Sequence, residues 1–506
     1  MLRARFVLSS MAAVCVLLCS HAALGSYGIY VGKNLTADGS VLLGGTGDEP
    51  SSHWLEIVPR KIHAPDETIE VGATKEANYP GELIRIPQVP VTARYITMNY
   101  SEFVGLPAPL TNGGLNEYGV AARDIWSPTR KDLAVMTPNP QHGVNYSDLS
   151  RIVMERAHSA REAVEIVGRL IEEYGYATYG GNSHLFADAK EGWILIDFAG
   201  GQGLWVAERL GPDDIRVSHP GYILEIPLDF QKHPDRFLGS RNFISFAVEH
   251  GWYDPHSGKP FSVDEVYQLG RGRSDSVKIM EERLRQKART QKITLRDFMD
   301  AVRDPILSAD WNGYGQVAHL RQGVSRPELN MLWVSATGSI TTPFVPYWIG
   351  VDKVPPEYGK HRYLSHAEET SFVTKDFQIQ EASQFAYITF KRLMYYTCDK
   401  PEKFLPEVSE AITTFENQSM EQSRRIEATA TKLYSVGETQ MGVDVLTNYS
   451  TRRAADALSL GNALLGSIEA RHRLLYGYRA PVSAEMSTRG HRWGVSVDCR
   501  RGQGVN

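Results

Sequence analysis

Cysteine is scarce in this sequence, with four Cys among 506 residues, and two of them, Cys15 and Cys19, lie close to the N-terminus. The remaining pair, Cys398 and Cys499, is too small a set for a disulfide scaffold, so a chain of this length must be stabilised by a buried core. These two thiols can form one bridge in an oxidising compartment or stay unpaired, and the sequence leaves both alternatives open.

Motifs for metals and dinucleotides are also missing. The sequence has no CxxC and no HExxH, its 15 His show no metal-ligand spacing, and its doubled glycines are not part of a strand-GxGxxG-helix unit. We therefore expect no cofactor and no metal.

Charge and hydrophobicity narrow the range of partners. A formal net charge of −5 gives no electrostatic reason to expect nucleic acid or an anionic membrane surface. No segment reaches the roughly 18 uninterrupted apolar residues of a membrane-spanning helix. We expect no nucleic acid partner and no membrane span, and the oligomeric state stays open, a homo-oligomer included.

The N-terminal residues are typical of a secretory leader. Arg3 and Arg5 precede a largely apolar run over residues 6–18 that is too short to span a bilayer comfortably. We expect residues 1–25 to be a signal peptide and the protein to be exported, to a periplasm or to the outside of the cell.

Small residues define two cleavage points in this leader. Ala23 and Gly25 satisfy the rule for cleavage before Ser26, whereas Ser20 and Ala22 satisfy it for cleavage three residues earlier. In the first case Ser26 opens the mature chain. Its hydroxyl then lies beside its own α-amino group, whose ordinary pKa of about 7.7–8.0 leaves some free base at neutral pH. One residue can thus supply nucleophile and base, or Ser26 can simply be the residue that follows a leader.

The residues after Ser26 are typical of a β-hairpin. A short strand over 29–32 is followed by the turn sequence Ala-Asp-Gly-Ser at 37–40 and a returning strand over 41–48. This pairing predicts that Ser26 lies near Asp48, which is either a functional acid or an exposed turn residue.

Further along, strands and helices alternate in blocks. Helices are predicted over 148–158, 159–175, 237–253, 263–302, 378–396, 406–436 and 451–476, the second opened by a Ser159–Glu162 capping box. Strands are predicted over 55–58, 83–86, 91–98, 119–122, 183–188, 193–198, 204–208 and 330–335. Helices that back antiparallel strands indicate a layered α+β architecture.

This distribution also predicts the domain organisation. Residues 26–370 are expected to form the mixed α+β domain, and residues 371–480 a helical C-terminal region packed on it. Residues 481–506 are expected to be a tail.

The opening of the mature chain resembles a known family. The gapless stretch Ser26–Ser40, Ser-Tyr-Gly-Ile-Tyr-Val-Gly-Lys-Asn-Leu-Thr-Ala-Asp-Gly-Ser, is similar to the start of the dipeptidase A/secernin family of N-terminal nucleophile (Ntn) hydrolases. Further landmarks follow in the family's order, so that the resemblance covers most of residues 26–475: Arg94-Tyr95, Gly114–Ala121, Ser159–Ala163, Glu172–Gly175, Gly181–Ser183, Ala187-Asp188, Glu191–Trp193, Leu332–Val334 and Phe344–Tyr347.

The resemblance implies a four-layer αββα sandwich and hydrolysis of an amide bond, commonly in a short peptide. It places Ser26 at the nucleophile position with its α-amino group as base, and Asp48 where the family has the acid that would orient the amine. Asn182 falls where related hydrolases have an oxyanion donor, and Asn116 lies near a second such position. Both asparagines also stand in glycine-rich sequence, where a turn residue is the alternative.

Two departures from the family pattern bear on substrate. The nucleophile is Ser instead of Cys, and Gly45 stands where the family usually has Arg. A dipeptidase or short-peptide peptidase is the function that the resemblance implies. An Ntn acylase that cleaves a non-peptide amide is an alternative, favoured by Gly45, and a catalytically silent binding protein of the same fold is another.

Overall fold

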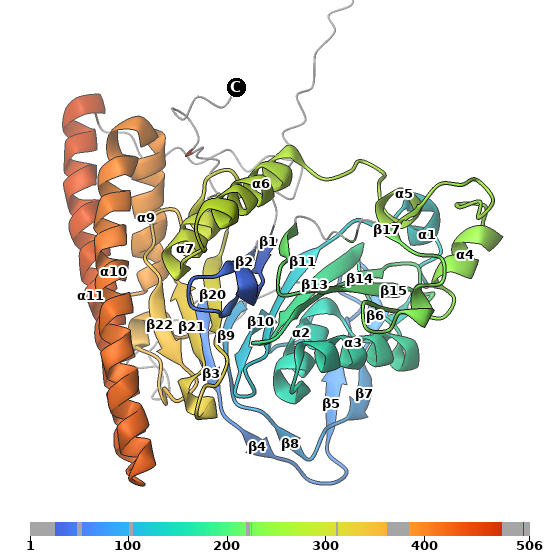
Figure 1. Ribbon diagram of the computed structural model, residues 1–506, viewed down its shortest axis with the longest axis horizontal. Coiled ribbons are helices and arrows are strands. Elements are labelled where there is room, and N and C mark those ends of the chain that lie inside the picture. Colours follow the sequence, from blue (N-terminus) through green and yellow to red (C-terminus); the bar gives the residue numbers. More distant parts are fainter. Residues whose placement is uncertain are drawn as a thin grey trace, which may run out of the picture.

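The computed structural model describes residues 26–47, 53–100, 105–218, 223, 225–309, 312–361, 384–477 and 499. The predicted signal peptide and Asp48 lie outside these residues. The described chain mixes helices with two large antiparallel sheets, as an α+β protein should (Figure 1).

The first sheet has six strands and contains the N-terminal hairpin. Its order is β16 (Ile215–Ser218), β1 (Tyr27–Val31), β2 (Val41–Gly47), β20 (Tyr314–Leu320), β21 (Met331–Ser335) and β22 (Val345–Trp348). The pairing of β1 with β2, with Tyr27 opposite Thr46, confirms the predicted hairpin.

The second sheet has eight strands. Its order is β18 (Phe237–Gly239), β15 (Trp205–Leu210), β14 (Gly192–Phe198), β13 (Gly181–Ala187), β11 (Ala121–Trp126), β10 (Thr111–Asn116), β9 (Tyr95–Tyr100) and β3 (His53–Val58). Strands β10, β11 and β13 of this sheet approach β1, β2, β20 and β21 of the first sheet. Side chains from the facing sides of the two sheets share one hydrophobic core.

Four short two-stranded ladders complete the β structure. They are β12 (Gln141–His142) with β6 (Gly81–Glu82), β17 (Glu225–Ile226) with β19 (Phe261–Ser262), β4 (Lys61–Ile62) with β8 (Val91–Thr92), and β5 (Thr68–Val71) with β7 (Ile84–Pro87).

Helices α2 (Tyr146–Arg156) and α3 (Ala160–Tyr174) cover the outer face of the eight-stranded sheet, where apolar residues of both form a second core (Figure 1). Ser159 caps α3 by accepting a 3.1 Å hydrogen bond from the Glu162 N–H. The predicted capping box is only half formed, because the Glu162 carboxylate accepts the N–H of His158 instead.

The six-stranded sheet carries its own helices. Helix α6 (Asp275–Thr290) contacts β16, and α7 (Leu295–Arg303) contacts β2 and β20. The single helix predicted over 263–302 is wrong: α5 (Val263–Tyr267) ends before Gly270 and Gly272, whose φ angles of 60° and 67° are unfavourable for other residues, and Thr294 caps α7 separately.

The helix predicted over 237–253 is also wrong at its start. Residues 237–239 form β18 on the edge of the eight-stranded sheet, and only α4 (Phe243–Glu249) is helical. Pairing of Phe237 with Glu208 therefore overrode the local helical pattern. A one-turn helix, α1 (Lys131–Ala134), follows β11.

Three helices form the C-terminal helical region, α9 (Ala386–Asp399), α10 (Pro401–Ser435) and α11 (Thr439–Tyr476), seen on one side of the molecule in Figure 1. Helices α10 and α11 begin earlier than predicted, and α10 contains Pro406. The buried Glu416 of α10 joins this region to the core, since it accepts hydrogen bonds from Arg303 at 2.5 Å, from the Phe344 N–H at 2.6 Å and from Arg296.

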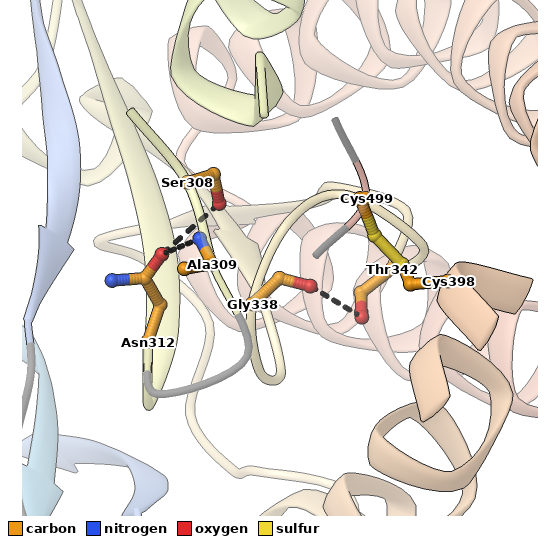
Figure 2. The surroundings of a disulfide bond; sticks show 7 residues. All are labelled: Ser308, Ala309, Asn312, Gly338, Thr342, Cys398 and Cys499. Carbon is orange, nitrogen blue, oxygen red and sulfur yellow. Dashed lines mark hydrogen bonds between the residues drawn. A yellow bond between two sulfur atoms is a disulfide. The ribbon is translucent and has the colours of Figure 1, made fainter. Parts of the chain in front are cut away.

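A disulfide joins Cys398 of α9 to Cys499, so the bridged alternative is the one that the structure has. Figure 2 shows the bond beside Thr342, whose hydroxyl donates a 3.1 Å hydrogen bond to the Gly338 carbonyl.

Candidate active site

Ser26 directly precedes β1, and the alternation of side chains along that strand places it. The Tyr27 hydroxyl donates a hydrogen bond to the Val302 carbonyl in α7, on the helix-covered face of the sheet. A Cβ added to Gly28 would instead lie 3.1 Å from Leu185 and 3.2 Å from Ile125 of the facing sheet. Since successive residues of a strand point to opposite faces, Ser26 falls on the face between the two sheets, and it is half-buried there.

The direction of β1 shows which end of the sandwich Ser26 occupies. Tyr30 lies against Gly192, the partner of Ala187 at one end of β13, whereas Gly28 faces Leu185 in its middle. Ser26 precedes Gly28 by two residues, so it lies beyond Leu185, toward the end of β13 where Asn182 is located.

Three polar side chains make hydrogen bonds between the two sheets in the region from Gly28 toward Ser26. Arg123 of β11 donates hydrogen bonds to the Tyr314 hydroxyl of β20 and to the Thr46 carbonyl of β2. Gln316, two residues along β20 from Tyr314, donates a 3.2 Å hydrogen bond from Nε2 to the Ala122 carbonyl. The two sheets are thus hydrogen-bonded to each other beside the residue that pairs with Tyr27.

Gly45 has no space for a side chain in this backbone. Its φ is +154°, and a Cβ there would lie 2.0 Å from the Tyr27 carbonyl oxygen. The arginine that the family usually has at this position could not be accommodated without moving β1.

Asp48 immediately follows Gly47, the last residue of β2, and lies outside the described residues. Thr46, which precedes Asp48 by two positions in the sequence, lies opposite Tyr27 in the pair of β1 with β2. The predicted closeness of Asp48 to Ser26 therefore stays a prediction that the hairpin supports.

Asn182 lies in β13, and its side chain has partners of its own. The Nδ2 atom donates a 3.0 Å hydrogen bond to Asp124, and the backbone N–H donates a 2.7 Å hydrogen bond to Asp197. Alternation puts Asn182 on the same face as His184 and Phe186, the face covered by α2 and α3, and puts Ser183 on the face toward β1. Asn182 and Ser26 share an end of the sandwich, but the structure does not bring their side chains onto one face.

Asn116 lies at the opposite end of the eight-stranded sheet, where β10 turns into β11. Its side-chain amide donates hydrogen bonds to the carbonyls of Met154 and Ala157 at 3.2 and 2.8 Å, and its Oδ1 atom accepts the N–H groups of Tyr118 and Val120. A turn role accounts for all four bonds, and the structure does not bring Asn116 near Ser26.

A buried acidic cluster surrounds Asn182. Burial raises the pKa of Asp124, although the positive charge of Arg123 and hydrogen bonds from Asn112 and Asn182 act in the opposite direction. Asp197 lies 3.2 Å from Nε2 of the fully buried His184. Sequence reasoning missed this cluster and Arg123, although the adjacent charged residues Arg123 and Asp124 inside an apolar strand were a visible signal.

Within the described ranges, no group of three or more His, Cys, Asp or Glu side chains is arranged to hold a metal ion. None of the described helices is both long and apolar enough to cross a membrane.

Comparison with known proteins gives one family match. Residues 27–277, just under half of the chain, match the model of Peptidase family C69. Curated relatives include "Probable dipeptidase A" of Streptococcus pyogenes serotype M3 (strain SSI-1), 26% identical over 43% of this chain and 44% of that protein. "Probable dipeptidase" of Salmonella dublin is 26% identical over 47% of this chain and 52% of that protein. The chain therefore spans about half the length of these relatives.

Among solved structures, the chain is similar to a mutant of the conjugated bile acid hydrolase from Clostridium perfringens. The similarity covers 62% of this chain and 89% of that one, at 11% identity and a TM-score of 0.29, which is too low to support an argument about the fold. Residues 27–277 are thus the part of this chain that is similar to Peptidase family C69.

Proposed function

We propose that this protein is an exported amide-bond hydrolase, a dipeptidase or short-peptide peptidase, in which Ser26 becomes the first residue and the nucleophile. The observation that carries the proposal is the position of Ser26, at the start of β1, between the sheets and beside polar groups that bridge them. The match to Peptidase family C69 over residues 27–277 supports the reaction type.

In the proposed mechanism the α-amino group of Ser26 takes the proton of the Ser26 hydroxyl, directly or through a water molecule, while the oxygen attacks the carbonyl carbon. Asp48 orients the amine. A tetrahedral oxyanion forms and is stabilised by hydrogen-bond donors, among which we propose the Asn182 side-chain amide, at the end of the sandwich that Ser26 occupies. The oxyanion collapses, the amine leaves, and water then releases the acyl group from Ser26.

The fold proposed for this activity is the four-layer αββα sandwich of the Ntn hydrolases. The contacts of α2 and α3 with one sheet and of α6 and α7 with the other support it, as do the contacts between the sheets. We further propose that residues 26–370 form this domain and that residues 371–480 are a helical addition. The Cys398–Cys499 bond supports export, because disulfides persist mainly in oxidising compartments.

An acylase that cleaves a non-peptide amide is a second candidate. The absence of any room for an arginine at Gly45 favours it, because a site that departs from the family here need not keep the family's substrate. A panel of dipeptides assayed beside a panel of N-acyl amides separates the two candidates, and a catalytically silent protein would turn over neither panel.

The decisive experiment for the nucleophile is N-terminal sequencing of the exported, active protein. The amine can act as base only if no residue precedes Ser26, since an amide nitrogen at that position cannot accept the proton. We expect the sequence to begin at Ser26, Ser26→Ala to abolish turnover with the fold intact, and Ser26→Cys to keep some activity. An active enzyme that stably begins at Ala23, or full activity in Ser26→Ala, would rule the mechanism out.

A further inference from the structure

Arg123 is a buried cation beside the candidate nucleophile. Its side chain belongs to a residue that is 1% exposed, and its guanidinium carbon lies 5.1 Å from the centre of the Tyr314 ring. The two hydrogen-bond acceptors of its guanidinium, the Tyr314 hydroxyl and the Thr46 carbonyl, are both neutral. The Nε–H group is buried and has no hydrogen-bond partner among the described residues.

The described chain provides no carboxylate that pairs with Arg123. Asp124, its neighbour in sequence, points to the opposite face of β11, where it accepts the hydrogen bond from Asn182. Every other arginine that is similarly buried, Arg303 and Arg453 for example, has an acidic partner. Burying a charge without an opposite charge beside it destabilises the folded protein, so a buried arginine without a carboxylate partner indicates a ligand that provides one.

A buried acceptor lies on the same inter-sheet face as this buried donor. Gln316 is 2% exposed, and its Nε2 group donates a hydrogen bond to the Ala122 carbonyl. Its Oε1 atom has no hydrogen-bond partner within the described part of the chain. Arg123 and Gln316 thus offer an N–H donor and a C=O acceptor on the same inter-sheet face. A group that carries both a carboxylate and an N–H would satisfy the two together.

The location connects these groups to Ser26. Arg123 binds the carbonyl of Thr46, and Thr46 is opposite Tyr27 in the β1–β2 ladder. Cα atoms of directly opposite residues in an antiparallel ladder are about 4.5–5.5 Å apart, so the guanidinium lies within the reach of a dipeptide bound at Ser26.

We propose that Arg123 binds a free carboxylate on the amine half of the substrate, next to the bond that is cleaved. The dipeptides of the proposed function carry such a carboxylate, and we place their scissile amide N–H at Gln316. This inference rests on the proposed function. A planar guanidinium suits it, because it can bind both oxygens of a carboxylate at once.

The test compares Ala-Ala with Ala-Ala amide, which differ only in the carboxylate, and with Ala-Ala-Ala, in which the carboxylate is about 3.3–3.6 Å further along the chain. The exported wild type should prefer Ala-Ala over its amide in kcat/KM by about 10- to 150-fold, the range expected for one hydrogen bond to a charged group. Arg123→Gln should bring the ratio close to one by slowing only Ala-Ala, and Arg123→Lys should keep part of the preference.

Arg425→Gln is the matched control, because the Arg425 side chain is 77% exposed on α10 and should leave the ratio unchanged. Equal turnover of acid and amide by the wild type would overturn the inference but not the hydrolase. So would an equal loss for both substrates in a folded Arg123→Gln protein, which would make Arg123 a link between the sheets only. If Arg123→Gln does not fold, Arg123→Lys and calorimetric titration of Ser26→Ala with acid and amide give the same comparison. A wild type that hydrolyses none of the substrates contradicts the proposed function itself, and the inference with it.

Discussion

The side-chain amide of Asn182 donates a 3.0 Å hydrogen bond to the carboxylate of Asp124, and both residues are buried. If Asn182 also serves the oxyanion, Asn182→Ala should lower kcat by about 100- to 1,000-fold. If it serves only Asp124, the variant should lose stability and keep its kcat, because the carboxylate would then be left without that donor. Steady-state kinetics together with the melting temperature separate these roles, and wild-type kcat in the variant would refute the catalytic one.

Asn116→Ala is expected to behave in the opposite way. The substitution removes the Nδ2 group, which donates to the carbonyls of Met154 and Ala157, and the Oδ1 atom, which accepts the N–H of Val120. These buried backbone groups then lose their hydrogen-bond partner. Each such group costs about 1–3 kcal/mol, so the melting temperature should fall clearly while kcat per folded molecule is kept. A 100-fold drop in kcat without a change in melting temperature would instead place Asn116 in the reaction.

Asp48→Asn tests the acid proposed to orient the amine. A carboxylate near the α-amino group stabilises its protonated form and so raises its pKa. Removing that charge should lower the pKa of the Ser26 amine, and the acidic limb of the pH profile of kcat/KM should shift to lower pH with it. An unchanged profile would assign Asp48 to the surface.

Glu281 makes the attachment of α6 dependent on pH. Burial acts to raise its pKa, but hydrogen bonds from Arg273 and Arg285 outweigh burial and hold the pKa below its usual value. A carboxylate with a lowered pKa in the folded state stabilises the protein above its unfolded pKa of about 4.3, and this stabilisation is lost as the pH falls through the folded value.

The melting temperature of Glu281→Gln should therefore lie below that of the wild type at neutral pH, and the gap should close in acid. Glu282→Gln, one residue further on the same helix and 50% exposed, should show little effect at any pH. A gap that stayed constant from neutral to strongly acidic pH would contradict the assignment.

The Cys398–Cys499 bond closes a loop with a sequence separation of 101 residues. Its loss in Cys398→Ser/Cys499→Ser should lower the free energy of unfolding by about 2–4 kcal/mol, because the unfolded chain gains conformational freedom. Thermal unfolding with and without reductant measures this: the wild type should respond to the reductant and the double variant should not. Two titratable thiols in the native exported protein would contradict the bond.

Local chemistry was sufficient to predict several elements. Helix α3 begins after Ser159, whose side chain caps the first turn, and ends at Gly175, whose φ of +88° stops the helix. Both effects come from the residue itself and can be predicted locally. The β1–β2 hairpin was likewise predicted, since a turn sequence between two apolar runs pairs neighbouring segments. These features depend on residues only a few positions apart.

The candidate site depends partly on local sequence and partly on tertiary contacts. The sequence alone indicated Ser26 and the strand that follows it, because the leader and the opening stretch are continuous in the chain. Which face Asn182 points to could not be read in this way: it depends on the pairing of β13 with β11 and β14 and on the side of that sheet that α2 and α3 cover. Alternation fixes only which residues share a face, never which face meets the other sheet.

The sequence by itself thus determined the class of fold, the N-terminal hairpin and the best-capped helix, because these follow from periodicity and caps within short windows. Only the tertiary structure decided that Cys398 pairs with Cys499 and that Phe237 joins a sheet edge instead of a helix. It also decided that Arg123 reaches Thr46, the partner of Tyr27 in the β1–β2 pair, from the opposite sheet. Each of these depends on a contact between residues that are far apart in the chain. Such contacts are set by how the two sheets and their helices pack together, and they leave no local pattern in the sequence.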